Sequence, residues 1–196
     1  MRNVGSWRPP LSRLERLLAA YRQHITLPWQ VGLAAIHRVV FCVYDKTEEL
    51  RLRVQVKEFE LATRQAGKGW LLLDVTDAFP HWMAAQEYRD AYFECPEDLA
   101  GYPEGELKEF LGDLVERLRA RIQQEADSET VVAVLGVGAL FGLARVSALV
   151  EGLKDSVPGR LVVFFPGEHH PETHSYRLLD ARDGWNYLAV AITGDE

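Results

Sequence analysis

The sequence predicts an α/β protein with an open, mainly parallel, Rossmann-like sheet flanked by helices and a C-terminal antiparallel hairpin at its edge. Three observations predict this class. Short apolar runs, typical of strands buried on both faces, alternate with amphipathic segments at helical spacing. The segments between these runs are long enough for the crossovers that parallel strands require. Two strand-like segments at the C-terminus flank Asp183-Gly184, a common hairpin turn.

The first half of the chain is expected to begin with a helix, because Ser12 and Glu15 form a capping box. Residues 50–56 alternate as a strand would, but parallel strands need a long crossover, and this favours a helix there. The predicted elements are a helix over about 12–24, a strand over 38–44, a helix over 46–66, a strand over 70–75 and a helix over 78–93.

The second half continues the alternation and then breaks it with the hairpin. Its predicted elements are a long amphipathic helix over about 105–126, a strand over 131–135, a helix over 139–154, a strand over 161–165, and strand-like segments over 175–180 and 185–192. We therefore expect one domain over 1–196, in which 1–37 form a basic helical segment and 38–192 form the core.

Composition excludes several classes of protein. The chain is 47% hydrophobic and 26% charged, which is ordinary for a globular domain, and its net charge of −7 argues against a general nucleic-acid binder. Its two cysteines suggest no disulfide framework. The most apolar stretch, 131–144, is shorter than the roughly 20 residues of a transmembrane helix. No secretory signal is visible, so we expect a cytoplasmic protein.

Charge is distributed unevenly along the chain. Residues 1–38 hold six arginines against one glutamate, whereas 94–127 hold ten acidic residues against four basic ones. Either region is a candidate docking face for a partner of opposite charge, although a solvated face is the simpler interpretation. The candidate partner-binding residues are Arg13, Arg16 and Arg22 on the basic segment, and Glu109, Asp113 and Glu116 on the acidic helix.

A second candidate site lies where the predicted strands end, because open α/β sheets bind ligands at their carboxyl edge. Acidic side chains there would suit magnesium, and glycines before a helix would expose amides to a phosphate. Helix capping by aspartates and a tight turn explain the same residues more simply. The weak cofactor-binding candidates are Asp45, Asp74, Gly136, Gly138 and Glu168.

The remaining motifs point to no chemistry. Glu168, His169, His170, Glu172 and His174 are rich in metal-ligating types, but a proline divides them and the stretch resembles a loop. No serine lies in a nucleophile elbow, and neither cysteine has a histidine in an interpretable frame. We expect no catalytic residue, no bound metal and no cofactor.

Three ordered segments of the C-terminal third resemble the BrxB family of bacteriophage-exclusion (BREX) systems. They are VVAVLGVGALFGLARVSALVEGL, LVVFFPGEH, and SYRLLD followed by WNYLAVAI. The earlier segment RVVFCVYDKTEELRLR is similar as well, so the resemblance spans about 38–192. The chain departs from the family in one place, because Arg145 stands where the family has a histidine.

The resemblance implies a component of a multi-protein phage-defence system that also contains a DNA methyltransferase (PglX), an alkaline-phosphatase-like protein (PglZ) and a large ATPase (BrxC). The family has no established catalytic activity. We therefore expect a non-catalytic adaptor that contacts PglZ, or else PglX or BrxC. A nucleotide- or metal-dependent enzyme using the carboxyl edge is the alternative. Direct binding of DNA through the N-terminal arginines is a weaker one.

Overall fold

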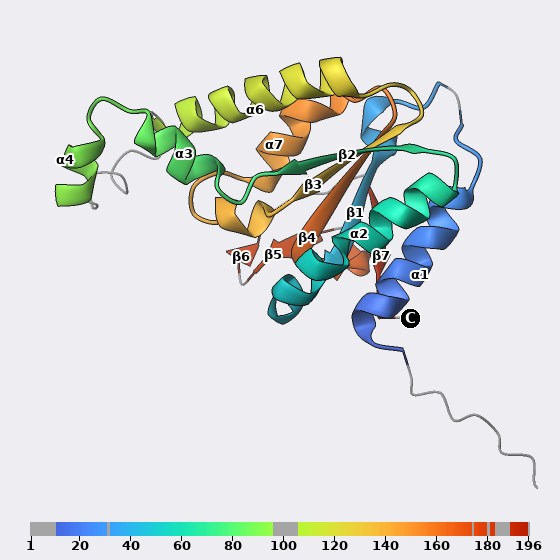
Figure 1. Ribbon diagram of the computed structural model, residues 1–196. Helices are drawn as coiled ribbons and strands as arrows, with labels where there is room; N and C mark the ends of the chain where they lie inside the picture. The colour runs from blue at the N-terminus through green and yellow to red at the C-terminus, as the bar shows by residue number, and fades with distance from the viewer. Residues whose placement is uncertain are drawn as a thin grey trace, which may run out of the picture.

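A sheet of parallel strands runs through the computed structural model, and helices cover both of its faces (Figure 1). The structure describes residues 11–30, 32–95, 106–173, 175–179, 181–182 and 189–195. The parallel strands lie in the order β2-β3-β4-β1-β7. Their bounds are β1 (Val39–Tyr44), β2 (Gly69–Asp74), β3 (Thr130–Leu135), β4 (Arg160–His170) and β7 (Val190–Thr193).

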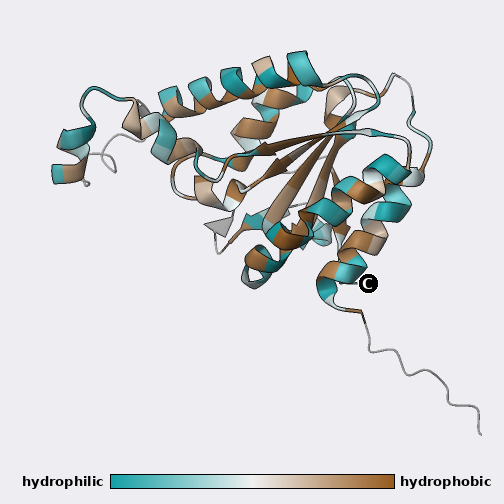
Figure 2. Ribbon diagram, in the orientation of Figure 1, coloured by the Kyte–Doolittle hydropathy of each residue, from teal (hydrophilic) through white to brown (hydrophobic). Residues whose placement is uncertain are grey.

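The helices form one layer on each side of this sheet. The α-helices are α1 (Arg13–Thr26), α2 (Glu49–Gln65), α3 (Ala78–Ala84), α4 (Arg89–Glu94), α6 (Glu106–Glu125) and α7 (Val146–Leu153). Single 3₁₀ turns are η1 (Ala35–Arg38), η2 (Lys46–Glu48), η3 (Val137–Leu140), η4 (Lys154–Ser156) and η5 (Pro171–Thr173). Figure 2 shows apolar strands between helices whose outer sides are hydrophilic.

The order of the strands explains which helix covers which face. The chain crosses from β1 to the far edge at β2 through α2, and then returns through β3 to β4. Parallel crossovers are right-handed. When the chain reverses the direction in which it adds strands across the sheet, its connecting helices therefore move to the opposite face. The protein therefore has two hydrophobic clusters, one on each face of the sheet. Helices α3, α6 and α7 pack on one face, and α1 and α2 pack on the other.

Helix α1 belongs to this core through one buried side. Ser12 and Glu15 form the predicted capping box, and Leu14, Leu17, Tyr21 and Ile25 are buried. The Tyr21 hydroxyl lies 2.5 Å from the Thr63 hydroxyl of α2, so the polar atoms of this pair satisfy each other inside the core. The basic segment is thus an integral layer of the fold as far as the described residues reach.

The structure confirms the predicted α/β class and most elements, including a helix rather than a strand at 50–56. Two predicted helices are broken. Residues 78–93 form α3 and α4 separately, and 139–154 form η3 and then α7. Tight packing beside Pro166 confines η3, since a Cβ on Gly138 would lie 3.2 Å from that ring. No described helix has the length and apolarity needed to cross a membrane.

The predicted C-terminal hairpin edge is not confirmed. Val190–Thr193 pairs with β1 in parallel instead of with the preceding segment. Ser175–Leu178 (β5) pairs antiparallel with the extended end of β4, and Ala181–Arg182 (β6) pairs with β5. The expected Asp183-Gly184 turn lies outside the described residues. The open edge of β1 takes the last strand, and Ile192 is buried there.

Candidate functional site

The carboxyl ends of β1 and β2 are joined by a network of polar side chains from α2. Arg53 donates from Nε to Glu49 Oε1 over 2.8 Å and from Nη2 to Thr76 Oγ1 over 2.7 Å. Its Nη1 lies 3.6 Å from Asp74 Oδ2. We call Tyr44, Glu49, Arg53, Asp74 and Thr76 the edge network. It occupies the carboxyl edge of the sheet, where the sequence placed the weak cofactor-binding candidates.

The Tyr44 end of this network is buried. The Tyr44 hydroxyl donates to Glu49, and the carboxylate of Glu49 also receives Arg53. Burial, aided by the neighbouring Glu49, raises the pKa of the Tyr44 hydroxyl far above its usual value, so it stays protonated as a donor. Glu49 is thereby held between two donors, which makes it a structural acceptor.

The two aspartates predicted at this edge both cap local turns. Asp74 accepts from the Thr76 amide over 2.9 Å. Asp45 accepts from the Thr47 amide over 2.8 Å and from the Thr47 hydroxyl over 2.6 Å, and Arg13 lies 3.4 Å away. The hydrogen bonds from Thr47, more than Arg13, hold the pKa of Asp45 below its ordinary value. Both side chains are therefore already engaged in hydrogen bonds within the protein.

Close packing explains why glycine occupies both ends of the Gly136-Val137-Gly138 turn. Gly136 has φ +85°, and a Cβ there would clash with the Thr76 hydroxyl and approach Asp74 Oδ1 to 2.9 Å. A left-handed backbone in contact with another turn admits only glycine without strain. The following η3 is a four-residue 3₁₀ turn. Gly136 thus lets the turn after β3 pack directly against Asp74 and Thr76 of the edge network.

Glu168 stands apart from these residues. It lies on the extension of β4, opposite Arg177 of β5, and its carboxylate is 3.5 Å from His170 Nε2. His169 packs against Tyr176, with ring centroids 4.7 Å apart. Within the described residues, no three His, Cys, Asp or Glu side chains are grouped to hold a metal ion; His174 lies outside them. The structure brings Asp74 and Gly136 together, but not Glu168.

The predicted basic docking residues mostly bind the chain itself. Arg16 donates from Nε to the Gly194 carbonyl over 2.7 Å and from Nη1 to the Leu11 carbonyl over 2.7 Å. Arg13 lies between Asp45 and Asp195, with 2.8 Å from its Nε to Asp195 Oδ1. Arg22 is 3.8 Å from Glu58. Arg13 and Arg16 thus fasten α1 to the end of β7.

The predicted acidic residues lie on the exposed side of α6. Glu109 and Glu116 form no hydrogen bond or ion pair with any residue in the described ranges. Asp113 accepts from Trp82 Nε1 over 2.9 Å and so ties α6 to α3. The acidic residues occupy the first part of α6, whereas Arg117, Arg119 and Arg121 follow in the second.

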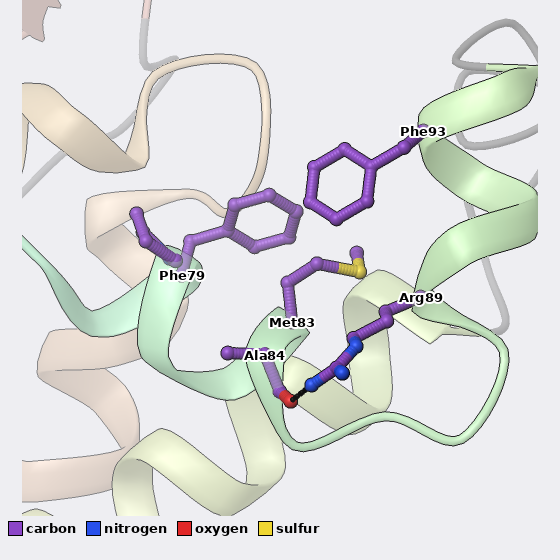
Figure 3. A pocket seen from close by; sticks show the side chains of 6 residues that line it. Phe79, Met83, Ala84, Arg89 and Phe93 are labelled. Atoms are coloured by element: carbon purple, nitrogen blue, oxygen red, sulfur yellow. Dashed lines mark hydrogen bonds between the residues drawn. The ribbon is translucent and has the colours of Figure 1, made fainter.

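One feature of α3 and α4 was not predicted from the sequence. A hollow of about 390 Å³ lies between α3 and α4, where Phe79, Met83 and Phe93 point into the same space (Figure 3). Arg89 borders it and donates to the Ala84 carbonyl over 2.9 Å. Phe93 is 71% exposed and Tyr88, at the start of α4, is 73% exposed. The sequence held one sign of this hollow: aromatic residues stand among polar ones in the helix predicted over 78–93.

Comparison with known families matches residues 73–192 to the family described as BREX protein BrxB. The match begins within β2 and ends within β7, so it covers the hollow, α6 and the Gly136 turn. It leaves out α1, β1 and α2. No curated protein and no solved structure matches the chain.

Proposed function

Since the chain belongs to the BrxB family and is therefore a component of a BREX phage-defence system, we propose that it acts as a non-catalytic adaptor. In this proposal it works in the cytoplasm and binds the alkaline-phosphatase-like protein PglZ. The other phage-exclusion proteins, PglX and BrxC, are the alternative partners. The proposal does not depend on chemistry at the carboxyl edge, where the edge network engages its own polar groups.

The observation that carries the proposal is the apolar hollow between α3 and α4. Aromatic side chains supply large contact areas and recur as the anchors of protein interfaces. Phe93 and Tyr88 are exposed beside a concave apolar surface, an arrangement that favours a partner side chain entering the hollow. In Figure 1, α4 lies at one end of the molecule, away from the sheet, and so presents this surface outward.

Exposed acidic side chains on α6 and α4 favour a basic partner surface. Glu109 and Glu116 are exposed on α6, and Asp113 joins that helix to α3 through Trp82. On α4 and before it, Glu87, Asp90 and Glu94 are exposed too. Opposite charges steer association and select partners. We therefore propose that PglZ offers an apolar side chain flanked by lysine or arginine.

Binding of purified PglZ to the full-length chain, measured by calorimetry, tests the proposed function. We expect a complex whose affinity falls at higher salt, because exposed charges are screened. The E109K/E116K variant should bind at least about tenfold more weakly, a loss of about 1.4 kcal/mol. The D155K/E172K variant, with two reversals at other exposed acids, should bind as the unaltered chain does.

A second variant separates the apolar part of the surface from the charged part. Phe93→Ser removes an aromatic ring that is 71% exposed, so it should leave the thermal unfolding of the chain almost unchanged. It should weaken binding of PglZ by about 30-fold, as expected for an interface anchor worth about 2 kcal/mol. If the unaltered chain does not bind PglZ at all, the proposed partner is wrong.

A further inference from the structure

A second hollow, of about 320 Å³, lies at the carboxyl end of β2 between α3 and α6. Asp74 and Asp77 border it on the strand side, His81 borders it from α3, and Arg117 and Arg121 border it from α6. Ligands of open α/β sheets bind outside the carboxyl ends of the strands. The volume lies at the lower end of the range of about 300–1,000 Å³ for small-molecule pockets.

The α6 side of this hollow offers two cationic groups, of which Arg121 already pairs with Glu125. Arg117 and Arg121 are one helical turn apart and so project from the same face of α6. Among the residues that the structure describes, Arg117 has no hydrogen bond or ion pair, and Arg121 pairs only with Glu125. Guanidinium groups bind phosphate oxygens in pairs of parallel hydrogen bonds. Two adjacent arginines therefore favour a phosphate on this side.

The opposite side of the hollow has a different chemistry. Asp74 is already engaged by Arg53 and by the Thr76 amide and hydroxyl. Asp77 precedes α3, yet its side chain makes no capping hydrogen bond, and it has no other partner in the described part of the chain. An ionised carboxylate accepts hydrogen bonds from hydroxyl groups. A ligand that joins a phosphate to hydroxyls would satisfy both sides at once.

We propose that this hollow binds a mononucleotide, with its phosphate on Arg117 and Arg121 and its ribose hydroxyls on Asp77. An aspartate that receives ribose hydroxyls is a familiar arrangement in nucleotide-binding α/β proteins. The site lies on the other side of α3 from the apolar hollow and involves none of the residues through which the chain is proposed to bind PglZ. It would therefore give the adaptor a small-molecule ligand of its own.

Calorimetry of the full-length chain with AMP, and separately with inorganic phosphate, tests this site. We expect AMP to bind, and R117Q and R121Q each to weaken its binding by about tenfold or more, equal to about 1.4 kcal/mol. R64Q is the matched control, because Arg64 is an exposed arginine on α2 paired with Glu60 at 2.8 Å. Circular dichroism verifies that every variant is folded.

Replacing Asp77 separates the ribose contact from the phosphate contact. Asp77→Asn should weaken binding of AMP several-fold while leaving inorganic phosphate bound as tightly or more tightly, since a repelling charge is removed. The proposal is overturned if AMP does not bind at millimolar concentration, whether or not phosphate does, or if R117Q and R121Q bind AMP as the unaltered chain does. Tighter binding of a single-stranded oligonucleotide than of AMP would also overturn it.

Discussion

At the scale of single residues, Gly136 joins the turn after β3 to the turn after β2. Its φ of +85° suits glycine, and a Cβ would enter the space of the Thr76 hydroxyl. We expect Gly136→Ala to lower the free energy of unfolding by about 2–4 kcal/mol, from backbone strain and the displaced turn together. Urea denaturation followed by circular dichroism measures this loss.

Gly142 is the control for that substitution. It has a similar φ of +76°, but no atom lies within 4 Å of the place where a Cβ would stand. Gly142→Ala therefore keeps the backbone strain and omits the collision, and should cost only about 1 kcal/mol. Equal losses for the two alanine variants would show that contact with Thr76 is unimportant.

Sequence reasoning located some residues of the carboxyl edge but not their function. Asp45 and Asp74 were placed correctly at strand ends, because a buried apolar run ends visibly where a polar residue follows. Arg53 and Glu49 were missed. They reach the edge only because α2 crosses beneath the sheet, and the position of a helix over distant strands depends on a strand order that no local pattern contains.

At the scale of elements, α1 and β7 depend on each other across the whole length of the chain. Arg16 holds the Gly194 carbonyl directly after β7, and Arg13 pairs with Asp195. We expect Arg16→Met to lower the free energy of unfolding by about 1 kcal/mol, since a charged donor to two carbonyls is lost. Hydrogen exchange should accelerate at the β7 amides and stay unchanged in β3.

Arg22→Met provides the comparison on the same helix. Arg22 is exposed and lies 3.8 Å from Glu58, a geometry that contributes little. Its substitution should change stability by less than about 0.5 kcal/mol and leave exchange in β7 as it was. A faster exchange in β7 for Arg22→Met as well would mean that general destabilisation, and not the contact with Gly194, is being measured.

Most elements were predictable because their signals are local. The capping box of α1, the apolar strands and the periodicity of α6 each reside within a few consecutive residues. The C-terminal pairing was not predictable in this way. Asp-Gly favours a hairpin, but β7 instead pairs with β1, whose unfilled edge offers hydrogen bonds and a buried position for Ile192. The preference of β7 for β1 depends on residues far from the turn, so the turn sequence does not reveal it.

At the scale of the whole molecule, the part that matches the BrxB family is not the whole folding unit. Residues 73–192 lack β1, which lies between β4 and β7, and lack α1 and α2, which cover one face. We propose that the chain forms a single cooperative domain. A fragment of residues 73–196 should therefore not fold alone, and the full chain should unfold in one transition.

Calorimetry and proton NMR of that fragment test this prediction. We expect no cooperative melting and poorly dispersed amide signals, because Phe164 and Val162 of β4 lose their packing partners on one face. Mixing the fragment with a second one covering 1–72 should restore folded signals, since the missing strand and helices are then present. A fragment 73–196 that melts cooperatively by itself would place a domain boundary near residue 73.

The place of β1 in the sheet also bears on how the protein is made. Val40 pairs with Val162 and with Val190, so β1 leaves the ribosome long before either neighbouring strand exists. At roughly 5–20 residues per second, the intervening stretch of about 120 residues takes on the order of ten seconds to synthesise. During that time the nascent segment VVFCVY has no strand on either side. Until then it is an unpaired apolar strand, and such strands favour aggregation of the unfinished chain.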